Sequence, residues 1–317
     1  MKFANQRMGD PKVQFEKLGN MVVRSDRNNW AEKIESIIRE PAPFPISYDV
    51  SATQTNNFSE YTYTEFLNGL SVSTQCKEIN ARLYDFASKI EAKDDSIIDI
   101  IRDQLADKYN LEDIDKKWQG IKKVVFLPGH NMLDIASVDI LSRLAHEEDD
   151  VYFKPHPVTI DEIEGLIAKK VGWNKMIPKN VSGFKLLLNC DEVYCTSASE
   201  MAISGTILGK KVINVSTYLN EGAGAYHALS RLLFIAHRKY GIEEAQRILN
   251  NVLSCEWTGH IFPHQSDDEV RYRVKKFYDK SLELRDLYKP LAAPFGEFLK
   301  KGKPTEEIKK ELKKQGM

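Results

Sequence analysis

Between residues 120 and 216, short runs of apolar residues alternate with segments in which apolar residues recur at helical spacing. The apolar runs KKVVFLPGH, VYFKP, EVYCTS and KVINVS have the length of buried strands. The segments between them, SVDILSRLAHEE, TIDEIEGLIAKKV, GFKLLLNC and SEMAISGTILG, have the period of helices. Strands that alternate with helices predict right-handed crossovers and a parallel sheet, so we expect a Rossmann-like α/β domain here.

The pattern before residue 120 is less regular. KFAN, NMVVRS and PFPISYDVS predict short strands, NNWAEKIESIIRE predicts an amphipathic helix, and residues 77–118 have a charged helical pattern. Residues 51–65 combine polar and aromatic residues without a core period, which predicts a long surface segment. Its aromatic stretch FSEYTYTEF suits stacking on a sugar or base, but packing is the simpler interpretation.

After residue 222 the pattern is mainly helical, and the lysine-rich C-terminal tail predicts a solvated helix. We therefore expect an α/β protein with two Rossmann-like lobes and a helical C-terminal segment. The expected divisions are a smaller N-terminal lobe over residues 1–118, a Rossmann-like lobe over 119–260, and C-terminal helices over 261–317.

Composition excludes several classes of protein. The chain has 317 residues, of which 42% are hydrophobic and 29% charged, and its formal net charge is -1. This balance is typical of a globular protein and lacks a global signature for binding polyanions. Neither an apolar run of about 18 residues nor the apolar core of a signal peptide is present. The sequence therefore predicts a cytoplasmic protein without a membrane span.

Four cysteines, Cys76, Cys190, Cys195 and Cys255, include no CxxC pair. Two of them, Cys190 and Cys195, lie in apolar surroundings around a predicted strand. Buried free thiols are a better interpretation of this distribution than a metal site or a disulfide.

The tetrapeptide Lys154-Pro155-His156-Pro157 directly follows the predicted strand VYF. Proline cannot donate to a sheet ladder and restricts the residue before it, so the tetrapeptide predicts a rigid turn at the strand end. Such a turn holds a cation and an imidazole in fixed places. Lys154 offers a point charge and His156 a hydrogen-bond donor for phosphate oxygens.

A second polar loop lies between the strand EVYC and the next helix. Thr196, Ser197 and Ser199 precede that helix and Glu200 begins it. Hydroxyls and free N–H groups at a helix N-terminus can hold a phosphate, although the same residues suit an ordinary N-cap. Because carboxyl ends of parallel strands share one edge, we expect this loop to lie near KPHP, which favours an anion site.

Two further loops reach the same predicted edge, LPGHNMLD and VSTYLNEGAG. The second contains Glu221, Gly222 and Gly224, which makes it a flexible loop after the last strand. The motifs of Rossmann dinucleotide sites and of P-loop NTPases are both absent from the sequence. These absences argue against a common dinucleotide oxidoreductase or P-loop enzyme.

The ordered motifs VVFLPGHNMLDIAS, VYFKPHP, GFKLLLNC and DEVYCTSASEMAISGTILGKKVINV resemble the donor-binding domain of GT-B glycosyltransferases. The bacterial capsule-polysaccharide enzymes and their sialyltransferase-like relatives are most similar, over about a third of the chain. The resemblance implies a nucleotide-sugar donor held between two Rossmann-like lobes. It also implies that His156, Ser197 and Ser199 contact the donor phosphate, that Lys154 assists, and that the loop with Glu221 and Gly222 touches the donor.

The first lobe shows no acceptor motif of that family, so the catalytic base must be sought among other residues. An inverting transferase needs a base for the acceptor proton, and cationic side chains can replace a metal at the leaving group. Candidates are Asp134, His130 in PGHN, and Asp10 in RMGDP. Asp134 is slightly favoured, although it suits an N-cap equally well. Arg7 could face the cleft, but an exposed arginine is the simpler interpretation.

The sequence thus predicts a glycosyltransferase that moves a sugar from a nucleotide-sugar donor to a hydroxyl, with no metal and no further cofactor. The acceptor is a glycan or a hydroxymethylated base of phage DNA. The net charge weakens the case for DNA, yet a local row of Lys and Arg suffices for backbone binding, and the target base could be flipped out. Two competing functions are a non-catalytic nucleotide-binding module and a nucleotide-sugar epimerase.

Overall fold

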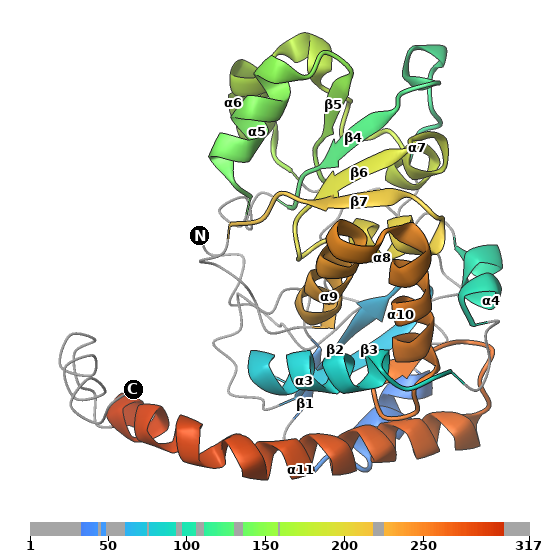
Figure 1. Ribbon diagram of the computed structural model, residues 1–317, viewed down its shortest axis with the longest axis vertical. Coiled ribbons are helices and arrows are strands. Elements are labelled where there is room, and N and C mark those ends of the chain that lie inside the picture. Colours follow the sequence, from blue (N-terminus) through green and yellow to red (C-terminus); the bar gives the residue numbers. More distant parts are fainter. Residues whose placement is uncertain are drawn as a thin grey trace.

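The residues that the computed structural model describes are 33–43, 46–48, 61–74, 76–92, 97–105, 111–129, 136–157, 159–217 and 225–300. For residues 286–300 the backbone alone is described. The described elements form two four-stranded sheets with helices between and around them (Figure 1).

One sheet is parallel and contains the four strands that the sequence predicts between residues 120 and 216. Its strands are β4 (Lys123–Phe126), β5 (Val151–Lys154), β6 (Glu192–Cys195) and β7 (Lys211–Asn214). They lie in the order β5-β4-β6-β7, and every neighbouring pair is parallel. The predicted parallel α/β arrangement is therefore confirmed for this part of the chain.

Helices cover both faces of the parallel sheet. They are α5 (Val138–Glu147), α6 (Asp161–Val171), α7 (Gly183–Asn189) and α8 (Met201–Ile207), with the 3-10 helix η3 (Trp173–Lys175) after α6. Val124 of β4 packs in one buried cluster with residues of α7 and α8, whereas Val125 packs in another with residues of α5 and α6. Since successive strand residues point to opposite faces, both faces are apolar, as the continuous apolar runs in the sequence indicate.

The second sheet is mixed. Its strands are β1 (Ile46–Tyr48), β2 (Tyr61–Phe66), β3 (Gly69–Thr74) and β8 (His260–Ile261), in the order β1-β2-β3-β8. β1 and β2 are parallel, whereas β3 is antiparallel to both β2 and β8. The expectation of two Rossmann-like lobes is therefore not confirmed, because only the β4–β7 sheet is parallel among the described residues.

The surface segment predicted over residues 51–65 is wrong from residue 61 onward. Tyr61 and Tyr63 are buried in β2, so packing is the correct interpretation of these two aromatic residues. Thr62, between them, is also buried, and its hydroxyl lies 3.1 Å from that of Ser73 on β3. Because both faces of β2 are covered, the strand shows no alternation between apolar and charged residues that the sequence could reveal.

The remaining helices lie between the two sheets and around the mixed sheet. They are α3 (Lys77–Ser88), α4 (Ile97–Gln104), α9 (Ala225–Tyr240), α10 (Ile242–Ser254) and α11 (Asp267–Lys300), with η1 (Lys116–Trp118) before β4 and a further helix at residues 33–39. The helical pattern predicted after residue 222 is confirmed for the described residues. Within these residues, no helix has a stretch long and apolar enough to cross a membrane.

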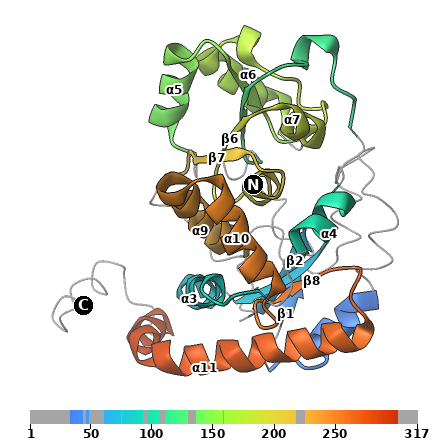
Figure 2. The ribbon, with the colours of Figure 1, turned by 45° about the vertical axis from the view of Figure 1, so that its right-hand side comes forward.

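In Figures 1 and 2, α9 and α10 lie between the sheets, and α11 runs along the side away from the parallel sheet. One buried cluster extends from the mixed sheet through α9 and α10 to Ile203 and Ile207 of α8. This cluster therefore connects the mixed sheet with α8, whereas the strands of the parallel sheet belong to the two other clusters. The division into residues 1–118, 119–260 and 261–317 stays a prediction.

The cysteines are free, as the sequence predicts. Cys190 and Cys195 are buried beside the parallel sheet, and burial raises the pKa of the Cys190 thiol to about 11. These two thiols are thus small apolar residues of the core at neutral pH.

His260 of β8 is a fully buried histidine in the core beside the mixed sheet. Its ring stacks on Phe66, with centroids 4.3 Å apart, and on Tyr84, with centroids 5.4 Å apart. Both ring nitrogens lack a hydrogen-bond partner within the part of the chain that the structure describes. Burial, with the nearby charge of Arg273, lowers the pKa of His260 to about 3.

We expect His260 to make the fold sensitive to acid. Its pKa is about 3 when folded and about 6.5 when unfolded, so the unfolded chain binds the extra proton in between. The free energy of unfolding should therefore decrease as pH falls from about 6.5 toward 3, by about 2 kcal/mol at pH 5 from this residue alone. Denaturant unfolding of the native protein and of His260→Phe at pH 7 and pH 5 checks this expectation. The variant should lose less stability, and equal losses would contradict it.

Candidate active site

The carboxyl edge of the parallel sheet gathers the loops that the sequence singles out. The register pairs Phe126 with Lys154 on one side and with Cys195 on the other, so the residues that follow β4, β5 and β6 begin at one level. The chain runs from β4 outward to β5, then crosses to β6 on the opposite side of β4. This reversal of strand order makes the carboxyl edge between β4 and β6 the expected place for a ligand.

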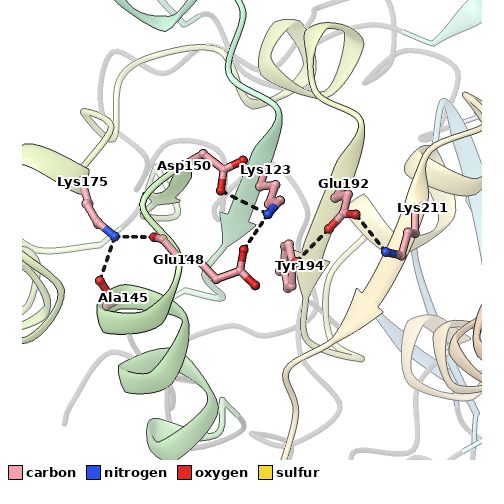
Figure 3. Close-up of polar contacts among 8 residues, drawn as sticks. All are labelled: Lys123, Ala145, Glu148, Asp150, Lys175, Glu192, Tyr194 and Lys211. Atoms are coloured by element: carbon pink, nitrogen blue, oxygen red, sulfur yellow. Dashed lines mark hydrogen bonds and ion pairs between the residues drawn. The ribbon is translucent and has the colours of Figure 1, made fainter.

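The amino edge of the same sheet is closed by ion pairs, which Figure 3 shows. Lys123 Nζ lies 2.5 Å from Glu148 Oε2 and 3.1 Å from Asp150 Oδ1. On the neighbouring strands, Lys211 Nζ lies 2.8 Å from Glu192 Oε1. The charged side chains at the start of these strands thus pair with one another.

The KPHP turn is held by lysine side chains. Lys154 is 2% exposed, and its ammonium group donates to the carbonyl oxygens of Pro155 and Lys179, each at 2.8 Å. Lys179 in turn donates to the carbonyl oxygen of Thr159 at 3.0 Å, and the N–H of Thr159 donates to the carbonyl oxygen of His156. The predicted turn after β5 is therefore present, and it is tied to the segment before α7.

His156 is half-buried in this turn, at the carboxyl edge. The hydrogen bond that closes the turn uses its backbone and not its imidazole. Contacts of His156 and Lys154 with a donor phosphate stay predictions.

The loop after β6 has a buried part and an accessible part. Thr196 and Ser197 are fully buried, whereas residues 198–200 are half-buried. Ser199 Oγ accepts the N–H of Met201 at 3.2 Å, so this hydroxyl satisfies a donor in the first turn of α8. Thr196 Oγ1 is buried without a hydrogen-bond partner among the described residues. Contacts of Thr196, Ser199 and Glu200 with a donor likewise stay predictions.

Ser197 ties this loop to two other segments. Its hydroxyl lies 3.1 Å from His227 Nδ1 in the first turn of α9, and its N–H donates to Ser216 Oγ at 2.8 Å. The N–H of Ser216 donates to Asn214 Oδ1, also at 2.8 Å. The loops after β6 and β7 and the start of α9 are thus one hydrogen-bonded unit. In this arrangement Ser197 faces inward, and its contact with a phosphate stays a prediction.

Tyr226 and His227, which the sequence pattern did not mark as site residues, lie in the first turn of α9. Tyr226 Oη donates to Glu200 Oε2 at 3.1 Å. Burial, together with the nearby charge of Arg231, lowers the pKa of His227 to about 4, so its imidazole is neutral at neutral pH. The signal in the sequence was their position directly after the glycine-rich loop that follows the last parallel strand.

The remaining predicted site residues, Asp10, His130, Asp134, Glu221 and Gly222, lie outside the described residues, as does Arg7. Among the residues that the structure does describe, no three His, Cys, Asp or Glu side chains form a group that could hold a metal ion.

No family model and no curated protein matches this chain. Among solved structures, the chain is similar to Spinosyn Rhamnosyltransferase SpnG, with 16% sequence identity and a TM-score of 0.28. The similarity covers 52% of this chain and 42% of that one, so the chain spans less than half the length of that protein. A similarity at this level assigns the chain to no family.

Proposed function

We propose that this protein is a glycosyltransferase that moves a sugar from a nucleotide-sugar donor to a hydroxyl acceptor. The observation that supports the proposal best is the strand order β5-β4-β6-β7, with its reversal between β4 and β6. It brings the LPG, KPHP and TSASE segments to one carboxyl edge, where ligands of such sheets bind. These segments belong to the motifs that resemble the GT-B donor domain, and they follow one another along the chain in the order of that resemblance.

In this proposal the acceptor oxygen attacks the anomeric carbon of the donor while the bond from that carbon to the phosphate oxygen breaks. The nucleoside phosphate leaves with the bonding electron pair, and His156 donates a hydrogen bond to it. A hydrogen-bond donor that is held rigidly in place before the reaction stabilises the charge that develops on the leaving phosphate. No reorganisation is then needed during the reaction, and a metal is not required. The KPHP turn, held by Lys154 and Lys179, supplies this rigidity.

The acceptor hydroxyl must lose its proton as it attacks. We assign this role to Asp134, because it follows β4 in the sequence and a carboxylate can accept the proton. His130, which also follows β4 in the sequence, and Asp10 are further candidates. Glu221 and Gly222 are assigned to the donor sugar or nucleoside, since they follow β7 in the sequence.

A turnover assay tests the proposal. The protein is incubated with labelled nucleotide sugars, alone, with oligosaccharides, or with DNA that contains hydroxymethylated bases. Release of nucleoside phosphate with transfer of the label to one acceptor class is the expected result. Binding without release would favour a nucleotide-binding module instead. A change in the sugar without release would favour an epimerase.

A further inference from the structure

The start of α9 holds the loop after β6 through two consecutive residues. Tyr226 donates to the carboxylate of Glu200 at 3.1 Å, and His227 Nδ1 lies 3.1 Å from the hydroxyl of Ser197. Glu200 lies in the half-buried part of the loop and Ser197 in its buried part. The first turn of α9 therefore contacts both the buried and the half-buried part of this loop.

Tyr226 also contacts the mixed sheet. Its ring stacks on that of Phe66 at the end of β2, with centroids 5.6 Å apart and an interplanar angle of 25°. Phe66 in turn stacks on His260 of β8, and His260 stacks on Tyr84 of α3. Figure 1 shows α9 between the parallel sheet and the strands β2 and β3, consistent with these contacts. One side chain thus touches the loop of one sheet and the core of the other.

We propose that Tyr226 is a positioning residue of the donor site, which sets the loop after β6 according to the packing of the mixed sheet. The inference rests on the proposed function, since the ligand of that loop is taken to be a nucleotide phosphate. Tyr226 has the chemistry for both contacts, because its phenol forms a charge-assisted hydrogen bond to a carboxylate and its ring forms an apolar stack.

Coupling of this kind is reciprocal. If the stack with Phe66 stabilises the loop in its binding position, then a ligand that binds the loop must stabilise the stack by the same free energy. A nucleotide at the carboxyl edge should therefore slow amide exchange in the hairpin formed by β2 and β3, on the other sheet. If Tyr226 does not position the loop, nucleotide should leave the exchange of this hairpin unchanged.

The test compares native protein, Tyr226→Phe and Tyr240→Phe. Tyr226→Phe removes the hydroxyl and keeps the ring that stacks on Phe66, so the fold should persist. Tyr240→Phe is the matched control, because Tyr240 ends the same helix and is 65% exposed. Titration calorimetry with CMP, UMP, UDP, GDP, ADP and TDP gives the affinity. Amide exchange with and without the bound nucleotide is followed at residues 61–74 and 196–200.

We expect Tyr226→Phe to bind nucleotide about tenfold more weakly, the size of one lost hydrogen bond to a charged group. In the native protein and in Tyr240→Phe, nucleotide should slow exchange at both segments. In Tyr226→Phe it should slow exchange at residues 196–200 only. Without nucleotide, the unfolding midpoint should be unchanged in Tyr240→Phe and lower by no more than a few degrees in Tyr226→Phe, because one hydrogen bond is lost.

Two results would overturn the inference. One of them would leave the proposed function unaffected, and the other would overturn both. Native affinity in Tyr226→Phe, with the exchange of residues 61–74 slowed as before, would remove Tyr226 from the donor site while the proposed function stands. A native protein that binds none of the six nucleotides would overturn the proposed function and this inference together.

Discussion

His156→Ala is expected to lower turnover about 100-fold, the effect of losing one hydrogen-bond donor that stabilises the leaving phosphate. His156 follows β5, the neighbour of β4, at the carboxyl edge where the nucleoside phosphate is proposed to leave. The turn should survive the substitution, because it is closed by the backbone carbonyl of His156 and by the lysine contacts of its neighbours. The measurement is the rate of nucleoside phosphate release at saturating donor.

His146→Ala is the matched control for this variant. His146 is an exposed histidine in the last turn of α5, the helix that leads to the amino end of β5. The substitution also removes an imidazole, but near the opposite edge of the sheet, so turnover should equal that of the native protein. Native turnover in His156→Ala would take His156 out of the mechanism. A comparable loss in both variants would show that the effect is not specific to the carboxyl edge.

Arg273→Met is expected to lower the free energy of unfolding by about 3 kcal/mol. The guanidinium of Arg273 donates to four backbone carbonyl oxygens, those of Leu253, Ser254, Cys255 and His260, at 2.8 to 3.2 Å. Three of these carbonyls belong to the C-terminal end of α10, which has no further turn to supply donors. Methionine fills a similar volume but leaves these carbonyls without the guanidinium.

The comparison for Arg273→Met is Arg271→Met on the same helix. Arg271 is exposed and pairs with the exposed Glu40 at 2.6 Å, so its loss should change stability by less than about 1 kcal/mol. Thermal unfolding checks both expectations. The midpoint should fall by about 4 to 5 °C in Arg273→Met and by less than about 2 °C in Arg271→Met. Equal midpoints in the two variants would refute the capping role.

The parallel sheet could be predicted from the sequence because each of its strands is apolar on both faces and is separated from the next by a helical period. The mixed sheet could not. Its strand β8 has two residues, His260 and Ile261, and pairs with β3 from a point far along the chain. That pairing also needs Gly259, at φ 80°, because a Cβ there would lie 2.3 Å from the carbonyl oxygen of Val72. Neither feature has a local period.

For the candidate site, the sequence predicted the loops but not what holds them. The prolines of KPHP predicted a turn, whereas the bond from Lys154 to the carbonyl oxygen of Lys179 joins residues that are 25 positions apart. Similarly, Ser197 was assigned to a phosphate from its place before a helix. That assignment stays a prediction, whereas the contact of the Ser197 hydroxyl with His227, 30 positions later in the chain, has no local signal. Contacts at such separations depend on how the elements pack, which no local pattern encodes.

The central claim is that the carboxyl edge of the parallel sheet binds the phosphate of a nucleotide. A thermal-shift panel of CMP, UMP, UDP, GDP, ADP and TDP on native protein, His156→Ala and His146→Ala tests this claim most directly. The account predicts that one nucleotide raises the unfolding midpoint of the native protein and of His146→Ala, with little or no increase in His156→Ala. An equal increase in all three proteins, or no increase with any nucleotide, would contradict it.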